Sequence, residues 1–273
     1  MQVRNIIILG ILILPLLGCK KITYFPDREI PLESPILVAH RGGRTAEYRE
    51  NTLAGIKAAL RYMGGVEVDV QISKDETVWL SHSADVTGCQ QSFKCFPECR
   101  DAELRTITTC NGDDISYTQL EDVYKFMHDS FPNAYICIDL KGWFPCSGNS
   151  ADIEGMMRRE AKVITEMAVK YGLERNTLIE TETSSVLLFV KSMNTKVGLY
   201  QTSYGEFERG MLLCLNYGMD GISYKMHIGE DLDKEKMDLL HKKGLKIMVW
   251  NLSSKEEAPH LVSIGVDYIQ VDL

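Results

Sequence analysis

The chain has 273 residues, enough for one large domain, and its composition excludes several classes of protein. With 45% hydrophobic and 25% charged residues, it has the balance of a globular protein with a full core and not that of a disordered chain. The net charge of −8 comes without a basic stripe, so we expect no nucleic-acid partner.

The first eighteen residues have the pattern of a secretory signal peptide. Arg4 gives a positive start, and the apolar run Ile6–Leu17 is shorter than the roughly 20 residues that a spanning helix needs. The run ends in Leu-Leu-Gly before Cys19, which resembles a bacterial lipoprotein signal with Cys19 as the lipidated first residue. We therefore predict an exported, membrane-anchored lipoprotein (periplasmic or cell surface) with a tether over 19–35. A plain signal peptide or an N-terminal anchor is the alternative.

Export affects how the remaining cysteines are interpreted. Cys89, Cys95, Cys99 and Cys110 lie close together in a segment with little periodicity. Their spacings lack the paired C-x-x-C knuckles of a zinc site, and disulfides form in an oxidising compartment. We expect disulfides here, with the pairing left open. Cys137 lies inside an apolar run and is predicted to be a small buried hydrophobic residue.

Beyond the tether, short apolar runs rich in β-branched residues alternate with amphipathic stretches. The runs predict eight strands, at Ile36–His40, Val66–Gln71, Tyr135–Leu140, Thr177–Thr181, Lys196–Gln201, Asp220–Tyr224, Lys246–Asn251 and Asp267–Val271. The stretches between them predict helices at about Thr52–Met63, Thr118–Ser130, Asp152–Tyr171, Ser184–Met193, Glu206–Tyr217, Leu232–Lys243 and Lys255–Ile264. Glycines that suit left-handed helix caps follow four of them, at Gly172, Gly218, Gly244 and Gly265.

This alternation is typical of parallel βαβ units, and eight strands indicate closure into a (β/α)8 TIM barrel over residues 36–273. A doubly wound open sheet is the alternative, but no G-x-G-x-x-G follows the first strand. A small cysteine-containing insertion, at about 83–116, comes after the second strand.

Chemistry in such a barrel belongs at the C-terminal ends of the strands. Glu67 and Asp69 lie two apart on one strand, so both side chains face the same way, and Asp139 and Lys141 repeat this spacing on the next barrel strand. Adjacent carboxylates repel, and burying them unpaired is costly. A bound divalent cation with oxygen ligands explains the pattern, with Lys141 attracting an anionic substrate. A salt bridge at the barrel mouth is the alternative for any single residue.

Two histidines accompany these carboxylates. His40 ends the first strand, and His82 ends a short extended run after the second. Phosphodiester cleavage needs one proton removed from the nucleophile and another given to the leaving oxygen. Imidazole suits both tasks at neutral pH.

These residues lie in motifs that resemble those of the glycerophosphodiester phosphodiesterase family. Residues 38–43 (VAHRGG) and 50–52 (ENT) are similar to its H-R-G…E-N-T signature, and residues 66–75 (VEVDVQISKD) to its E-x-D-V-x-x-[ST]-K-D segment. His82 stands where the family's second histidine falls, and residues 138–141 (IDLK) resemble its I-E-x-K strand. Weaker matches follow at 249–251 and 265–269.

The resemblance implies a barrel enzyme that hydrolyses glycerophosphodiesters to sn-glycerol 3-phosphate and an alcohol, using one divalent cation, Ca²⁺ or Mg²⁺. It implies that His40 and His82 are the general acid–base pair, in an order left open. It further implies metal ligation by Glu67, Asp69 and Asp139 with Glu50 as fourth ligand or support, phosphate contacts by Arg41 and Lys141, and an apolar wall at Trp250.

Three positions depart from the family pattern. Ser83 replaces the aspartate that follows the second histidine, so an orienting carboxylate is missing or replaced. Asp139 is one methylene shorter than the usual glutamate. The fourth strand has Glu180-Thr181-Glu182 in place of serine–phenylalanine, and we expect these acids to face solvent in preference to a cationic head group.

Two other functions remain as alternatives. One is a phosphodiesterase of the lysophospholipase D or sphingomyelinase D kind on a related barrel, which an aspartate third ligand would suit. The other is a non-catalytic, ligand-binding lipoprotein. The retention of both histidines and three carboxylates argues against a barrel that has lost its activity.

Overall fold

The computed structural model describes residues 35–44, 47–86, 94–107, 117–141, 152–227, 232–252 and 257–273. The predicted signal peptide, Cys19 and nearly all of the tether lie outside the described residues, as do Cys89 and Cys110. Within the described ranges, no helix combines the length and the apolar character needed to cross a membrane.

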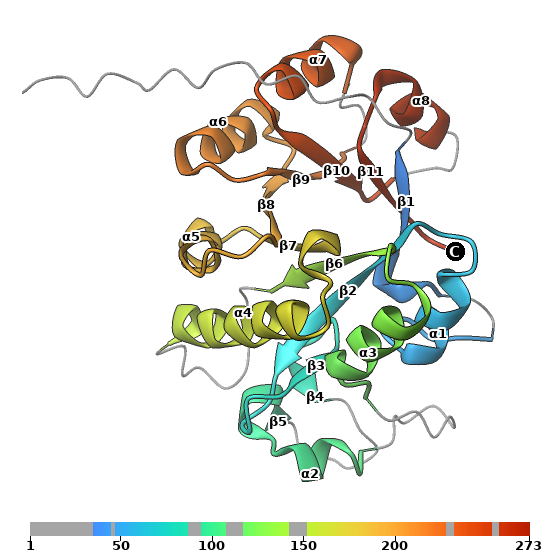
Figure 1. The fold of residues 1–273 in the computed structure, drawn as a ribbon, viewed down its shortest axis with the longest axis vertical. Coiled ribbons are helices and arrows are strands. Elements are labelled where there is room, and N and C mark those ends of the chain that lie inside the picture. Colours follow the sequence, from blue (N-terminus) through green and yellow to red (C-terminus); the bar gives the residue numbers. More distant parts are fainter. Residues whose placement is uncertain are drawn as a thin grey trace, which may run out of the picture.

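Eight parallel strands form a closed barrel, which confirms the predicted fold (Figure 1). They run in the spatial order β1-β11-β10-β9-β8-β7-β6-β2, and β1 pairs with β2 to close the ring. The strands are β1 Ile36–Ala39, β2 Gly65–Ile72, β6 Tyr135–Leu140, β7 Thr177–Thr181, β8 Gly198–Tyr204, β9 Gly221–Lys225, β10 Lys246–Trp250 and β11 Tyr268–Val271.

Helices surround this ring, one following most strands (Figure 1). They are α1 Leu53–Ala59, α3 Leu120–Ser130, α4 Ile153–Lys170, α5 Ser184–Ser192, α6 Phe207–Tyr217, α7 Lys234–Lys242 and α8 Glu257–Ile264, with a 3-10 turn η3 at Glu174–Asn176. Three begin later than predicted because Thr52, Asp152 and Asp233 serve as N-caps, their side chains accepting hydrogen bonds from Gly55 N, Gly155 N and Lys236 N. The four predicted glycine caps all have positive φ.

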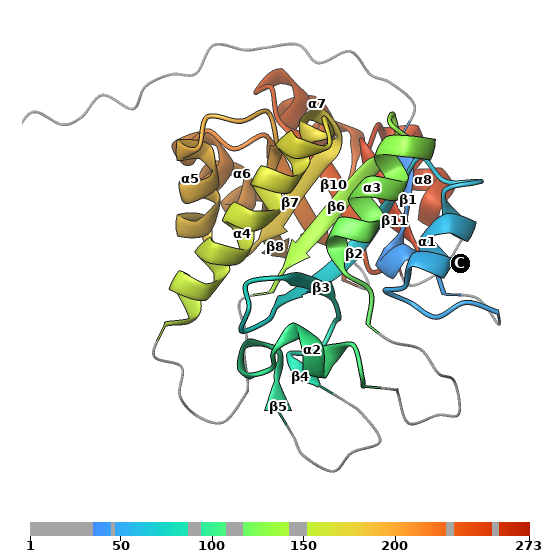
Figure 2. The same cartoon turned by 60° about the horizontal axis from the view of Figure 1, so that its bottom comes forward.

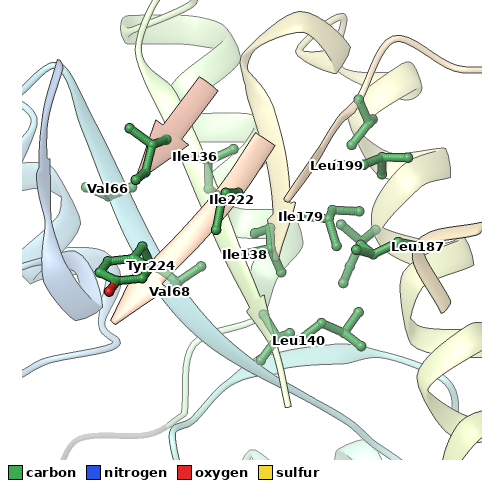
Figure 3. Close-up of a cluster of buried hydrophobic side chains, with 14 of the residues drawn as sticks. Val66, Val68, Ile136, Ile138, Leu140, Ile179, Leu187, Leu199, Ile222 and Tyr224 are labelled. Atoms are coloured by element: carbon green, nitrogen blue, oxygen red, sulfur yellow. The ribbon is translucent and has the colours of Figure 1, made fainter. Parts of the chain in front are cut away.

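Alternate residues of each strand point to opposite sides of the barrel wall. The outward set packs against the helices in one large apolar cluster that includes Val68, Ile138 and Ile179 (Figure 3). The inward set begins, on the side of the N-terminal ends of the strands, with a separate apolar group. It is made of Val38, Cys137, Leu178, Tyr200, Met248 and Tyr268. Cys137 is free and fully buried, as predicted. Polar inward residues follow above this group, toward the C-terminal ends.

The insertion after β2 forms a small layer of its own. The strand β3 Val78–Leu80 pairs antiparallel with β2, and β4 Asp85–Val86 pairs with β5 Lys94–Cys95. The 3-10 helix η2 Phe96–Glu98 and the helix α2 Asp101–Leu104 complete its described part. Figure 2 shows this layer beyond the C-terminal ends of β2 and β6.

The cysteines of the insertion differ in state. Cys95 is disulfide-bonded, with its partner outside the described residues. The expected disulfide at Cys99 is wrong, because Cys99 is free. Its side chain is buried with Trp79, Phe96 and Leu104 in the insertion's own core, where it serves as a small apolar residue.

Candidate active site

A tight turn after β1 carries the first histidine. His40 opens the 3-10 turn η1 (His40–Gly42), and Arg41, Gly42 and Gly43 all have positive φ, of 52°, 69° and 85°. A Cβ atom on Gly42 would lie 2.6 Å from Cγ1 of Ile56, so glycine is required there by space as well as by conformation. The turn aims the backbone N–H of Arg41 at Glu67 Oε2, 2.7 Å away.

The three predicted carboxylates converge. One oxygen from each of Glu67, Asp69 and Asp139 lies within 4.8 Å of those of the other two. Glu67 and Asp69 are buried and Asp139 is partly buried. Burial, followed by the charges of Asp69 and Asp139, raises the pKa of Glu67 well above its usual value. These closely spaced oxygen donors therefore fit a divalent cation, which would relieve their mutual repulsion.

Asn51 holds Asp69 by two hydrogen bonds. Its Nδ2 donates to Asp69 Oδ2 at 2.9 Å, and its Oδ1 accepts from the backbone N–H of Asp69 at 3.1 Å. Asn51 is buried and has a φ of 54°, a conformation that asparagine tolerates better than most residues. The role of Asn51 was not predicted from the sequence, where its small amide next to Glu50 in the ENT motif was the available signal.

Two cationic side chains border the carboxylates. Lys141 Nζ lies 3.0 Å from Asp69 Oδ1 and also donates to Asp139. These two carboxylates raise the pKa of Lys141 against the effect of burial, so the lysine is charged. Arg41 donates to Glu50 Oε1 at 3.0 Å, and its Nε lies 3.4 Å from Asp69. Glu50 thus binds Arg41 and is not one of the three clustered carboxylates.

The two histidines flank this cluster. His40 Nδ1 is 2.7 Å from Asp272 Oδ1, and its Nε2 is 3.9 Å from Glu67 Oε2. Because a carboxylate only accepts, the proton of neutral His40 sits on Nδ1 and leaves Nε2 facing the cluster. His82 is partly buried; burial lowers its pKa, against an opposing effect of Asp69. Asp272 directly follows the last predicted strand, Asp267–Val271, but nothing in the sequence pairs it with His40.

Glu180 does not face solvent, so the expectation for this residue was wrong. It lies inside the barrel with 3% of its surface exposed, where Ser223 Oγ and Gln270 Nε2 donate to its two carboxylate oxygens. Burial, with a further contribution from Asp139, raises the pKa of Glu180 to about 8. The reason is strand alternation, which puts Glu180 on the same inward face as Leu178. Glu182 is exposed, as expected.

Trp250 lies at the C-terminal end of β10, where a wall of the site was expected. Its ring packs edge-on against Tyr204 at the end of β8, with ring centroids 6.0 Å apart. Lys225, at the end of β9, lies over both rings. The predicted site residues lie within β2, in or directly after β6, at the end of β10, or in the segments that follow β1 and β3.

A family model described as "Glycerophosphoryl diester phosphodiesterase family" matches residues 40–273. Among curated proteins, a glycerophosphodiester phosphodiesterase of Caldanaerobacter subterraneus subsp. tengcongensis is 25% identical, over 87% of this chain and 93% of its own. A lysophospholipase D of Rattus norvegicus is 30% identical, over 86% of this chain and 82% of its own.

The fold is also similar to solved structures. One is a phosphodiesterase of Oleispira antarctica in complex with the product sn-glycerol-3-phosphate, with a TM-score of 0.70 and 16% identity. The match covers 87% of this chain and 92% of the other.

Proposed function

Because this chain belongs to the glycerophosphoryl diester phosphodiesterase family, we propose that it hydrolyses glycerophosphodiesters to sn-glycerol 3-phosphate and an alcohol. The proposal includes one divalent cation, Ca²⁺ or Mg²⁺, and acid–base catalysis by His40 and His82. The observation that carries it is the convergence of three carboxylates, held within 4.8 Å of one another, beside these two histidines.

The carboxylates Glu67, Asp69 and Asp139 would hold the cation, since their oxygens are the ligands that both ions prefer. When bound, the cation supplies Lewis-acid polarisation of the phosphoryl oxygens. Asn51 and the backbone N–H of Arg41 keep two of these carboxylates in place by hydrogen bonds. Lys141 adds a fixed positive charge to the same cluster and would attract the phosphate.

The surroundings of the two histidines suit different roles. Burial favours the neutral form of His82, as a general base requires to take a proton from the attacking hydroxyl or water. Asp272 on Nδ1 of His40 stabilises an imidazolium, so His40 suits the general acid that protonates the leaving oxygen. In the family pattern, an aspartate follows the second histidine, where this chain has Ser83 after His82. Asp272 would supply an orienting carboxylate in its place, for His40 and not for His82.

Lysophospholipase D activity is a second candidate, because a 30% identical relative carries that name. Offering glycerophosphocholine and lysophosphatidylcholine side by side separates the two. We expect glycerophosphocholine to be cleaved faster, at the bond that leaves sn-glycerol 3-phosphate. Cleavage of the lysolipid alone would replace the first proposal with the second.

We also propose that the protein is a lipoprotein anchored through Cys19. The support is the sequence Leu16-Leu17-Gly18-Cys19 after a short apolar run. Labelled palmitate should be incorporated into the wild-type chain and not into Cys19→Ala. Equal labelling of both would rule out lipidation at Cys19 and would leave the proposed reaction unaffected.

A further inference from the structure

The side of the mouth opposite the carboxylates ends in an aromatic–lysine cluster, here defined as Tyr204, Lys225 and Trp250. The three residues stand in register on neighbouring strands, since Lys225 pairs with Tyr204 on one side and with Trp250 on the other. Lys225 follows Ser223 by two residues, and Ser223 donates to Glu180 inside the barrel. Strand alternation therefore places Lys225 on the inward face, at the mouth.

The ammonium of Lys225 is fixed by two rings. Its Nζ lies 5.3 Å from the centroid of Trp250 and 5.7 Å from that of Tyr204, within range of cation–π attraction. Among the residues that the structure describes, no carboxylate forms an ion pair with it at 4 Å or less. The rings hold the charge in place without neutralising it.

The cluster and the carboxylates share one mouth. The strand β9 is four strands from β2 in either direction around the ring, so Lys225 lies across the mouth from Asp69. Burial, followed by the charges of Glu182 and Asp139, raises the pKa of the Tyr204 hydroxyl at this mouth. A diester held by its phosphate at the carboxylates would extend one of its two halves toward Lys225.

Two aromatic rings alone would suit a quaternary ammonium such as choline. In this cluster the place over the rings is already taken by the ammonium of Lys225, so a second cation would meet like charge. We propose that Lys225 is a specificity residue that favours glycerophosphodiesters whose alcohol half carries its own negative charge over those that release choline. This inference rests on the proposed function and narrows its substrate class.

Glu182 is the acidic residue that opposes this preference. It is exposed at the end of β7, and its charge acts on the Tyr204 hydroxyl, although it makes no ion pair with Lys225. Neutralising Glu182 should therefore strengthen the preference for an anionic alcohol half, and neutralising Lys225 should weaken it.

The test compares kcat/KM for glycerophosphoinositol 4-phosphate, glycerophosphoinositol and glycerophosphocholine, with Ca²⁺ or Mg²⁺ present. We expect the wild type to prefer the phosphorylated substrate. Lys225→Met should lower kcat/KM for that substrate alone, by about ten- to a hundredfold, as expected for a hydrogen bond to a charged group. Lys225→Arg, which keeps the charge, should retain the preference, and Glu182→Gln should increase it.

Lys246→Met is the matched control, because Lys246 lies over the ring of Tyr268 at 5.7 Å, at the opposite end of the barrel. It should leave the preference unchanged. A wild type that cleaves glycerophosphocholine at least as well as the phosphorylated substrate overturns the inference, as does an equal loss on all three substrates in Lys225→Met. In both results hydrolysis itself persists. If the wild type cleaves none of the three, the proposed function fails, and the inference with it.

Discussion

At the scale of single residues, the site depends on side chains that fix others in place. Asp272 binds Nδ1 of His40, and Asn51 binds both the side chain and the backbone of Asp69. The acidic and histidine members of the site follow from strand spacing and motifs. The pairing of Asp272 with His40 does not, because the two residues are 232 apart in sequence and meet only when the barrel closes.

Asp272→Asn should lower kcat by about tenfold and leave KM nearly unchanged, since asparagine still holds the ring but no longer stabilises its charged form. His40→Ala should lower kcat by about 10²–10⁴-fold, the usual contribution of an acid–base group. Steady-state kinetics of both variants tests whether kcat falls further in His40→Ala than in Asp272→Asn. Equal losses in the two variants would mean that the charge of Asp272 matters as much as the imidazole of His40, and would contradict a supporting role for Asp272.

Glu160 on α4 gives a prediction for stability. It is fully buried, neither of its carboxylate oxygens has a hydrogen-bond partner among the described residues, and burial raises its pKa to about 8. The folded state therefore keeps Glu160 protonated at pH values where the unfolded state ionises it. Its contribution to stability is full below the unfolded pKa near 4.5 and is lost as the pH rises toward 8.

Glu160→Gln should therefore flatten the pH dependence of stability between pH 5 and 7.5, by about 1.4 kcal/mol per pH unit at most. Urea unfolding at several pH values measures this slope. Glu166→Gln, an exposed position on the same helix, is the control and should change the slope little. An unaltered slope in Glu160→Gln would mean that Glu160 titrates normally in the folded protein.

At the scale of elements, periodicity predicts the order and type of strands and helices well. The strands β6 and β7 begin and end at the residues predicted from the sequence. The strand β8 instead continues to Tyr204, past the predicted end at Gln201. The apolar run stops at Gln201, but backbone pairing with β9 extends the strand. Local hydrophobicity could not predict that extension, so Tyr204 was missed as a residue of the mouth.

The turn after β1 is the element most sensitive to a small change. Gly42→Ala would place a methyl group in a left-handed conformation and against Ile56. We expect a loss of about 1–3 kcal/mol in the free energy of unfolding, together with reduced kcat from a displaced His40. Chemical denaturation and kinetics test both effects. Gly172→Ala is a useful control, since it has a similar φ but no atom within 4 Å of the added methyl group.

At the scale of the whole molecule, the buried carboxylates of the site lower the stability of the folded state when no cation is bound to them. Ca²⁺ or Mg²⁺ should raise the Tm of the wild type, by an amount equivalent to about 2.7 kcal/mol at a hundred times the Kd. Glu67→Gln should raise the Tm of the metal-free protein, because a neutral amide avoids the cost of burying this carboxyl beside two others. It should also abolish the shift, because it removes a ligand. An undiminished shift in Glu67→Gln would place the cation elsewhere.

The most direct test of the proposed metal-dependent hydrolysis is product analysis after incubation of glycerophosphocholine with metal-free and reconstituted protein. We predict sn-glycerol 3-phosphate and choline with Ca²⁺ or Mg²⁺, no turnover after chelation, and recovery when the ion is restored. Full activity in the presence of chelator would contradict the metal dependence of the reaction. Release of glycerol and phosphocholine in place of these products would contradict the proposed site of cleavage.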